Sequence, residues 1–355
     1  MSFQSASTML DASVIICTHN PRSDYFARVL DGLRNQTLPL HKWELLIIDN
    51  ASRLPLASSW DISWHPTARH ILESELGLTP ARRRGIQEAS SDLIIFVDDD
   101  NVLDETYLAE AIKIEQEWPS LGVWGSGYIP GDLEVELPES LRKHRSWLPL
   151  REVTAPHWSS LASCELDPLF AWIGQIDLRK QGLSHAIPLG AGLCVRKKVA
   201  MAYRQFCDQS SIHISDRQGD SLFSGGDIEI SWVCCSHGFG IGIFPELKLT
   251  HLIPQHRVSE DYFVRFVEGA CFSDFLLDYK WRHIIPQSPF SIKTLLSVLK
   301  TILLYRGVDR KMRFAWVRAL AKAKRIIEMD VRENNGQTYH MAARVPSEAP
   351  AGADR

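Results

Sequence analysis

"LIIFVDDDN", from Leu93 to Asn101, joins five apolar residues directly to three consecutive aspartates. The apolar part is typical of a strand that is buried on both faces, as in a parallel sheet. Ionised carboxylates side by side repel one another and are poor strand residues. We therefore expect a buried strand that carries an acidic cluster at its end for a reason other than strand stability.

The sequence around this stretch alternates between apolar strands and helices. Strands are expected at Ala12–Thr18, Trp43–Asp49, Ala68–Ser74 and Asp92–Asp98. Helices are expected at Tyr25–Asn35, at Leu78–Ala89 and from Asp104 to about Glu117. Continuous apolar strands that alternate with helices predict an α/β fold with a mostly parallel central sheet flanked by helices.

Polar residues follow three of these strands. "THN" (Thr18–Asn20) follows the first strand, "DNAS" (Asp49–Ser52) the second, and the three aspartates the fourth. In open α/β sheets, ligands bind beyond the carboxyl ends of the strands. These residues are therefore expected to open onto one crevice.

The rest of the chain is less regular at first and then helical. Residues 125–189 show weak periodicity and are expected to form an acceptor-side insertion of loops and short helices. Two short strands with a turn near Pro245 are expected within Gly240–Pro254. A strand and a helix are expected in Ile187–Phe206, and a loop that enters a helix in Ser224–Gly238. Further helices are expected at Ser259–Trp281, Ser291–Tyr305 and Asp309–Met329.

Composition excludes several classes of protein. The net charge of −4 argues against a nucleic-acid binder, which is usually basic. The seven cysteines are scattered without a CxxC pair, which indicates reduced, intracellular thiols and no zinc site. The first residues lack the basic and apolar pattern of a signal peptide, and no stretch reaches the roughly 18 apolar residues of a membrane span.

The aspartate cluster has a chemical interpretation. Carboxylate oxygens suit Mg²⁺ or Mn²⁺, and such a cation can bridge and neutralise a diphosphate. The alternative is a solvated loop. If the strand pleat continues, Asp98 and Asp100 point to the same side and Asp99 points away, so Asp99 is not expected to be the main metal ligand.

Two further candidates for the expected crevice, Asp49 and an arginine cluster, also have purely structural interpretations. Asp49 could accept hydrogen bonds from a base or a ribose, or it could cap the turn that follows. "GLTPARRRGI" (Gly77–Ile86) offers a helix N-terminus and three arginines for a diphosphate. Adjacent arginines cannot share one helical face, so at most two reach the crevice and the others pair with Glu88 or Asp92 or face solvent.

Two more candidates lie in the second half of the chain. Asp227, in "GGDIE", either complements the helix dipole together with Glu229 or serves as a general base toward an acceptor hydroxyl. His251, at the end of a strand in "LTHLIP", is either structural or a metal ligand.

A basic amphipathic segment follows near the C-terminus. Eight basic residues and one acidic residue lie between Arg306 and Arg325, where "FAWVRALAKAKRIIE" mixes aromatic and aliphatic residues with Arg and Lys. This pattern suits a helix on an anionic membrane surface. The alternative is a helix that packs on its own domain and keeps a solvated basic face.

Seven motifs in order resemble one family. They are "VIICTHN", "LLIIDNAS", "GLTPARRRGI", "FVDDDN", "GAGLCVRK", "SGGDIE" and "LTHLIPQHR". Together they cover about residues 12–270 and look like a family 2 glycosyltransferase of the GT-A fold, of the bacterial cell-surface polysaccharide type. The resemblance implies a Rossmann-like sheet with a C-terminal helical extension.

The resemblance implies donor-side roles for five residues. Thr18 and Asn20 correspond to nucleotide contacts at the end of the first strand. Asp49 corresponds to the residue that reads the uracil, and Arg82 lies near the nucleotide and diphosphate. Asp98 corresponds to the first aspartate of the DxD motif, which contacts the ribose and the metal shell.

The resemblance also implies a metal site and a catalytic base. Asp100 corresponds to the metal ligand, which His251 can complete with Mg²⁺ or Mn²⁺, and Asp227 corresponds to the base. Two positions depart from the family pattern. Gly226 replaces a frequent glutamate, and Gly190–Gly192 replaces a "GxN" strand, so an acceptor-side carboxylate and an amide are absent.

The expected activity is therefore inverting transfer of a sugar from a nucleotide sugar, most simply a UDP-sugar, to a hydroxyl of a glycan or lipid-linked acceptor. The alternatives are a sugar nucleotidyltransferase and a catalytically silent sugar-binding protein on the same fold. No nucleic-acid partner is expected. A cytoplasmic location is expected, with peripheral binding to the inner face of the membrane as a further expectation.

The resemblance divides the chain into four expected parts. Residues 1–125 are expected to bind the nucleotide sugar and residues 126–258 to bind the acceptor. Residues 259–330 are expected to form the helical extension, and residues 331–355 a disordered tail.

Overall fold

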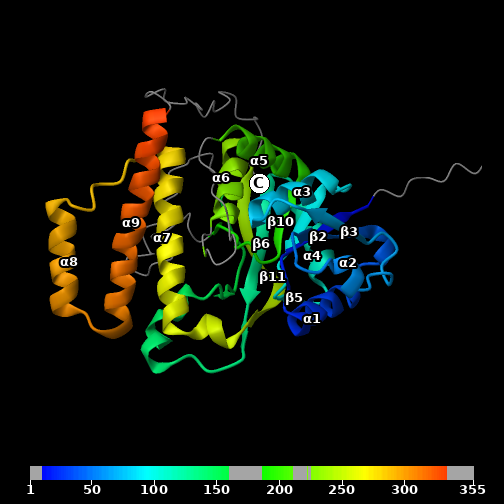
Figure 1. Cartoon of the computed structure of the whole chain (residues 1–355). Helices are drawn as coiled ribbons and strands as arrows, with labels where there is room; N and C mark the ends of the chain where they lie inside the picture. The colour runs from blue at the N-terminus through cyan, green and yellow to red at the C-terminus, as the bar shows by residue number, and fades with distance from the viewer. Residues whose placement is uncertain (1–9, 160–185, 211–221, 223–224, 334–355) are drawn as a thin grey trace, which may run out of the picture.

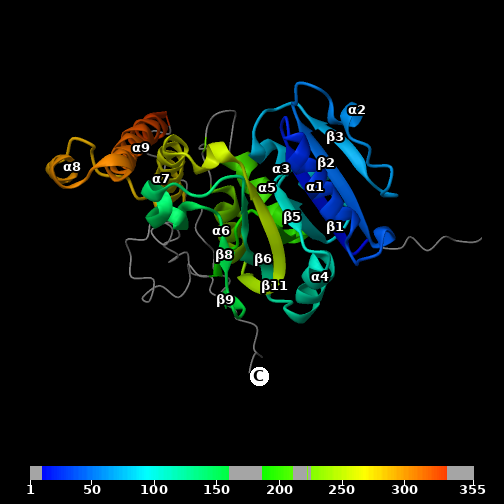
Figure 2. The same ribbon diagram turned by 90° about the horizontal axis from the view of Figure 1, so that it is seen from below.

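The computed structural model describes residues 10–159, 186–210, 222 and 225–333. Most of the expected tail and part of the expected acceptor-side insertion lie outside these residues. The described chain folds around one central sheet, with helices on both faces and three long helices at one side (Figures 1 and 2). The predicted α/β class is therefore confirmed.

The first half of the sheet is parallel and has the strand order β3-β2-β1-β4. Its strands are β1 (Ala12–Thr18), β2 (Trp43–Asn50), β3 (Arg69–Glu73) and β4 (Leu93–Val97). Their bounds agree with the expected strands to within one or two residues at each end. The parallel arrangement places the carboxyl ends of β1 and β4 side by side.

The second half of the sheet is mixed. β10 (Leu193–Arg196) lies antiparallel between β4 and β6, and β11 runs parallel to β6. The remaining strand bounds are β5 (Asn101–Leu103), β6 (Leu121–Ile129), β7 (Gly131–Leu133), β8 (Arg151–Glu152), β9 (His157–Ser159) and β11 (Gly240–Ile253). β6 spans the expected boundary at residue 125, so one sheet passes through both expected halves.

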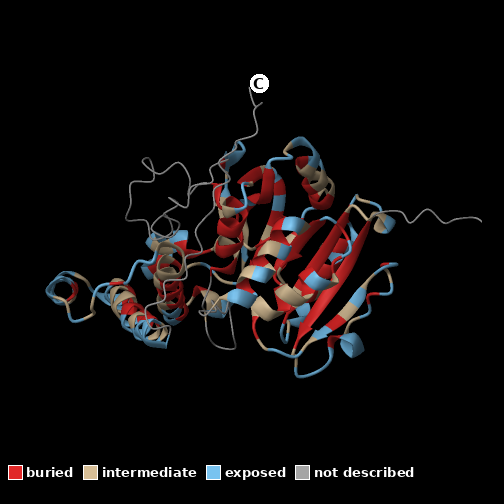
Figure 3. Cartoon of the chain, turned by 90° about the horizontal axis from the view of Figure 1, so that it is seen from above, coloured by how far each residue is buried: buried red, intermediate tan, exposed pale blue. Residues whose placement is uncertain are grey.

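Helices cover both faces because the inner strands are apolar on both sides. Along β1, Ile15 belongs to one buried cluster, whereas Val14 and Ile16 belong to the other. Figure 3 shows the inner strands almost entirely in the buried colour. The covering helices are α1 (Ser23–Arg34), α3 (Leu78–Glu88), α4 (Tyr107–Glu117), α5 (Lys197–Gln209) and α6 (Gly226–Ser236), with the short α2 (Leu56–Ser59) beside β2 and β3.

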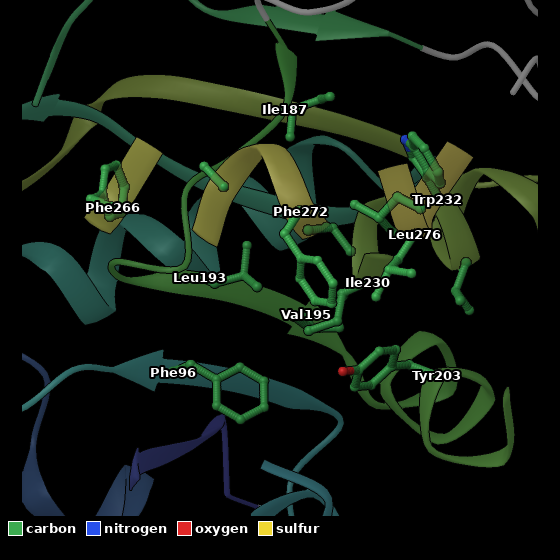
Figure 4. Packing of buried hydrophobic residues seen from close by; sticks show 14 of the residues in the cluster. Phe96, Ile187, Leu193, Val195, Tyr203, Ile230, Trp232, Phe266, Phe272 and Leu276 are labelled. Carbon is green, nitrogen blue, oxygen red and sulfur yellow. The ribbon is translucent and has the colours of Figure 1, made fainter. Parts of the chain in front are cut away.

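The C-terminal helices are α7 (Glu260–Arg282), α8 (Ile292–Leu304) and α9 (Gly307–Glu333). α7 joins the core through Phe272 and Leu276, which lie near Ile230 and Trp232 of α6 (Figure 4). Burial of each such side chain contributes about 1.5–3 kcal/mol. The expected helical extension is therefore fastened to the sheet domain by α7.

The segment Gly240–Pro254 differs from expectation. It forms one 14-residue strand, β11, instead of two short strands with a turn at Pro245. Pairing with β6 shifts register between Phe244 and Lys248, so Pro245 lies at a strand irregularity. Proline has no backbone N–H to donate and is tolerated at such a bulge without ending the strand.

The basic amphipathic helix also differs from the membrane-bound interpretation. The apolar side of α9 is buried in the same cluster as α7, through Met312, Ala315, Ala319, Ala323 and Ile327. Arg318 and Lys322 form ion pairs with Glu268 of α7. The alternative interpretation, a helix packed on its own domain, therefore describes α9. Within the described residues, no helix is both long and apolar enough to span a bilayer.

Candidate active site

A cavity of about 590 Å³ opens at the carboxyl ends of β1 and β4. Its other walls come from α3, from the loop before β10, from the first turn of α6 and from the segment that joins β11 to α7. Seven of the eight predicted site residues line it: Thr18, Asn20, Arg82, Asp98, Asp100, Asp227 and His251. The predicted crevice therefore corresponds to one cavity.

The three aspartates lie in a turn instead of continuing the strand. β4 ends at Val97, and the N–H of Asn101 donates to the carbonyl oxygen of Asp98 at 3.1 Å. The expectation that the strand pleat sets the direction of these side chains was wrong, because the chain reverses before the pleat can continue. The roles of Asp98 and Asp100 follow from the family resemblance and stay predictions.

Asp99 is held by the end of the neighbouring strand. Its Oδ2 accepts a hydrogen bond from the hydroxyl of Thr18. Burial, together with the charges of Asp100 and Asp98, raises the pKa of Asp99 to about 6. Thr18 and the aspartate turn therefore form one polar cluster across β1 and β4.

Asp100 forms the centre of a second cluster. Its Oδ2 lies 2.6 Å from Nη1 of Arg257 and 3.5 Å from Nε2 of His251. Its Oδ1 accepts a hydrogen bond from Nδ2 of Asn101 at 2.9 Å. Although burial lowers the pKa of Arg257, the Asp100 carboxylate outweighs this effect and raises it. Arg257 therefore stays charged beside Asp100.

The side chains around Asp100 include two possible ligands for a divalent cation, Asp100 itself and His251. Within the described part of the chain, no group of three or more His, Cys, Asp or Glu side chains could hold a metal. Two ligands that each lie about 2.1 Å from one ion are about 3–4 Å apart, and the 3.5 Å between Asp100 and His251 meets this condition. Asp100 and His251 therefore fit a cation whose remaining ligands come from a bound diphosphate and water.

Arg257 occupies the position at which Asp100 and His251 would hold a cation. Its Nη1 lies within 3.4 Å of Nε2 of His251 as well as 2.6 Å from Asp100. The guanidinium thus fills the space between the two ligands with a positive charge of its own. A cation at this point requires Arg257 to release Asp100.

The loop after β1 is fixed to the loop after β2. The N–H of Asn20 donates to Oγ of Ser52 at 3.0 Å, and Oδ1 of Asn20 accepts from the N–H of Arg53 at 2.9 Å. A ring nitrogen of His19 lies 2.7 Å from the carbonyl oxygen of Asn50. These contacts place Asn20 at the edge of the cavity.

Asp49 serves the loop that follows it. Its Oδ1 accepts from the N–H of Ser52 at 3.0 Å, and its Oδ2 accepts from the N–H of Leu56 at 2.9 Å. It is buried and does not line the cavity, whereas the adjacent Asn50 does. The capping interpretation is thus observed, and the role of Asp49 toward a uracil stays a prediction.

One of the three adjacent arginines reaches the cavity. Arg82 is 4% exposed and lies over the ring of Phe96, 5.9 Å from its centroid. Arg83 pairs with Asp208 of α5, and Arg84 lies 3.1 Å from Glu88. This agrees with the expectation that at most two would reach the crevice. Arg84 pairs with Glu88 as expected, whereas Arg83 pairs with Asp208 instead of Glu88 or Asp92.

Asp227 lies on the opposite wall, in the first turn of α6. Its Oδ2 accepts from the N–H of Gly190 at 2.8 Å, and its Oδ1 accepts from the N–H of Ile228 at 2.9 Å. A Cβ at Gly190 would lie 3.0 Å from Nη2 of Arg82 and 3.6 Å from Oδ2 of Asp227. Gly190 is therefore the point at which Arg82 and Asp227 approach each other.

Gly192 explains the departure from the "GxN" pattern. Its φ is +69°, and a Cβ there would lie 2.3 Å from the hydroxyl of Tyr107. The same hydroxyl donates to the carbonyl oxygen of Gly192 at 2.6 Å. Tyr107 thus occupies the space that an amide side chain would need.

Arg257 and Arg151 are among the charged residues of the cavity that were missed from the sequence. Arg257 lies six residues after His251 in "LTHLIPQHR", and this motif was a usable signal. Arg151, in β8, is half-buried, and this burial lowers its pKa to about 10 against the opposing effect of Asp227. Its Nη1 has no hydrogen-bond partner in the described structure. Arg151 lies in the segment expected to be irregular, where no pattern singles it out.

Comparisons with known proteins agree with this architecture. Residues 13–164 match the model of glycosyl transferase family 2. Glycosyltransferase AglE of Haloferax volcanii is 24% identical over 135 residues, which are 37% of this chain and 42% of that protein. The chain therefore spans less than half of this relative's length.

Two solved structures are similar in shape. The mannosyltransferase PcManGT of Pyrobaculum calidifontis, solved with GDP-Man and Mn²⁺, is 14% identical with a TM-score of 0.52, over 90% of this chain and 88% of that one. S. aureus TarS 1–349 is 13% identical with a TM-score of 0.44, over 89% of this chain and 91% of that one. Residues 13–164 are therefore similar to glycosyl transferase family 2, and the fold is the expected GT-A fold.

Proposed function

We propose that this chain transfers a sugar from a nucleotide sugar to an acceptor hydroxyl with inversion at the anomeric carbon. The observation that carries the proposal is that the aspartate turn after β4 and Asp227 on α6 line the same cavity. One wall offers groups for a diphosphate, and the other offers a carboxylate for an acceptor. Residues 1–125 would hold the donor and residues 126–258 the acceptor.

The donor side would bind the nucleotide through short-range polar contacts. Thr18, Asn20 and Asp98 border the cavity where a ribose and diphosphate would lie, and Arg82 adds a buried positive charge. Asp49 is proposed to reach the uracil of a UDP-sugar, and this is the least supported of the donor contacts. Hydrogen bonds from buried charged groups are strong and directional, so they favour one orientation of the donor.

Asp100 and His251 would hold a divalent cation, Mg²⁺ or Mn²⁺. When bound, such a cation neutralises charge that develops on the diphosphate leaving group. Arg257 must release Asp100 first, and its guanidinium then becomes free to pair with a phosphate oxygen. Thus Arg257, a partly exposed arginine, would keep the carboxylate paired before the donor arrives and support the diphosphate afterwards.

Asp227 would accept the proton of the acceptor hydroxyl. The acceptor oxygen then attacks the anomeric carbon, the bond from that carbon to the diphosphate oxygen breaks, and the nucleoside diphosphate leaves. The N–H of Gly190 fixes the carboxylate, which keeps lone pairs for the incoming hydroxyl. A single displacement with one base inverts the configuration.

The acceptor is proposed to be a glycan or a lipid-linked glycan of the cell surface, made at the inner face of the cytoplasmic membrane. This part rests on the family resemblance alone, because the apolar side of the basic helix α9 is buried against α7. Gly192 and Gly226 stand where amide and carboxylate side chains often occur, so the acceptor contacts of relatives do not transfer to this chain.

Nucleotide release from a panel of UDP- and GDP-sugars tests the proposal, with and without Mn²⁺ or Mg²⁺. We expect metal-dependent release from at least one donor, and faster release when an acceptor is added. Release of pyrophosphate from a nucleoside triphosphate and a sugar phosphate would instead identify a nucleotidyltransferase. Donor binding without any release would identify a sugar-binding protein.

A further inference from the structure

α8 presents its leucines and isoleucines outward and its two threonines inward, the reverse of an ordinary surface helix. Thr294 and Thr301 are buried, whereas the leucines and isoleucines around them are 46–77% exposed. Six of these residues form one stripe, named here the α8 outer face: Ile292, Leu295, Leu296, Leu299, Ile302 and Leu303. An apolar stripe of this kind usually marks a surface that another apolar body covers.

The inner side of α8 is satisfied within the chain. Oγ1 of Thr301 donates to the carbonyl oxygen of Ser297 at 2.8 Å, and Oγ1 of Thr294 donates to that of Ser288 at 3.2 Å. α8 lies beside α9, on the side away from the sheet, in two views at right angles (Figures 1 and 2). Of these two contacts, the one from Thr294 joins α8 to the preceding loop, so rotating the helix to hide its leucines would break it.

The stripe is continuous and wide. At about 100° per residue, the six residues of the α8 outer face cover roughly 120° of the helix. Phe290, just before the helix, is 82% exposed, and Ile284 and Ile285 are about half exposed. The apolar surface therefore continues from the loop into the helix.

The charges around the α8 outer face favour an anionic partner. Residues 283–308 contain Lys293, Lys300, Arg306 and His283 and no aspartate or glutamate. Both lysines are exposed and lie at one flank of the stripe. A second copy of the chain would bring the same positive charges together, whereas anionic lipid headgroups complement them.

We propose that α8 lies in the plane of an anionic lipid bilayer, with the α8 outer face in the acyl region and its lysines among the headgroups. Its 13 residues span about 20 Å, less than the roughly 30 Å of a bilayer core, so the helix lies on the surface instead of crossing it. This surface is separate from the cavity, and the proposal stands independently of the proposed reaction.

Co-sedimentation of the full chain with vesicles tests this proposal. Phosphatidylcholine vesicles with about 30% phosphatidylglycerol are compared with vesicles of phosphatidylcholine alone. We expect binding to the anionic vesicles, and at least about tenfold weaker binding for Leu296→Gln/Leu299→Gln/Leu303→Gln, because each leucine contributes through burial. The double variant Lys293→Gln/Lys300→Gln should lose the preference for anionic vesicles.

Leu54→Gln/Leu72→Gln is the matched control. Both leucines are exposed, at 72% and 64%, and lie far from α8 in the chain. This variant should bind vesicles like the wild type. Equal binding by the triple α8 variant would overturn the proposal. Absence of vesicle binding by the wild type would also overturn it. If such a wild type instead forms a dimer that the triple variant does not form, the α8 outer face is a dimer interface. Thermal unfolding of each variant shows whether it is folded.

Discussion

Asp227 and Glu229 lie two residues apart in the first turn of α6, yet they belong to two different regions of the molecule. Asp227 lines the cavity and accepts from the N–H of Gly190. Glu229 is 1% exposed, lies 2.6 Å from Nζ of Lys280 and accepts from Nε1 of Trp281 at 3.3 Å. The Asp227 carboxylate faces the cavity, and the Glu229 carboxylate joins α6 to α7 through an ion pair and a hydrogen bond.

The difference shows that the position of a residue on a helix decides which part of the molecule its side chain faces. Residues two apart on an α-helix point about 200° away from each other, so one faces the cavity when the other faces α7. In the sequence, both are acids at a helix start and both could complement the dipole. Only the elements packed around α6 separate the two functions.

Asp227→Asn should have the largest effect, on the rate of transfer. The amide cannot accept the proton of an acceptor hydroxyl, so we expect kcat to fall by about 10²–10⁴-fold. The Kd for the nucleoside diphosphate should change little, because that ligand is placed at the other wall. Nucleotide release and calorimetric binding measure the two quantities. A variant that keeps the wild-type rate would remove Asp227 from catalysis.

Glu229→Gln should act on stability instead of catalysis. The change leaves the Lys280 ammonium buried without its carboxylate, and breaking such a pair costs about 3–5 kcal/mol. Denaturant unfolding should show this loss, while the folded variant keeps its rate of transfer. Glu260→Gln is the control, because its pair with Lys311 is exposed and should contribute little. Equal stability of the two variants would contradict the structural role.

Asp100→Asn tests the donor end of the cavity. The change weakens both the contact to Arg257 and the proposed cation site, so we expect about 10²-fold lower activity and a higher metal concentration for half-maximal rate. Activity measured over a range of Mn²⁺ concentrations provides the readout. An unchanged metal dependence would mean that Asp100 is not a metal ligand.

His65 should give the smallest effect, a pH dependence of stability far from the cavity. Its ring packs 4.2 Å from that of Trp43, and burial lowers its pKa from 6.5 to about 4. The folded state therefore binds fewer protons than the unfolded state between these values. Stability is fully present above pH 6.5 and is lost progressively as the pH falls toward 4.

His65→Phe keeps a ring at this position and removes the titration. Unfolding free energies measured from pH 4 to pH 7 should then lose this component of their slope. A variant with the same slope as the wild type would assign the pH dependence to other groups.

Much of the fold could be predicted because local patterns determine it. Apolar runs such as Ala12–Thr18 are long, β-branched and bounded by polar residues, so the strands of the parallel half agree closely. The cavity could be predicted because parallel strands bring their carboxyl ends together. The predicted order of strands and helices was therefore enough to predict that Thr18 and the aspartate turn lie close together.

The remaining features depend on contacts distant in sequence. In the sequence, Pro245 indicates a turn. In the structure, β11 pairs with β6 on both sides of the irregularity at Pro245, so the strand continues. The pattern of α9 does not show that α7 covers its apolar face, and the pattern of α8 does not show that its leucines face outward. Arg257 takes its place beside Asp100 only because β5 pairs with β11.

A crystal structure with UDP and Mn²⁺ tests most directly the central claim, that Asp100 acts on the donor and Asp227 on the acceptor at opposite walls of one cavity. We predict a diphosphate in the cavity, an anomalous manganese signal between Asp100 and His251, and Arg257 released from Asp100. Asp227 should remain free of the nucleotide and face the acceptor side. A nucleotide bound elsewhere, or Arg257 still paired with Asp100 beside a bound diphosphate, would contradict the account.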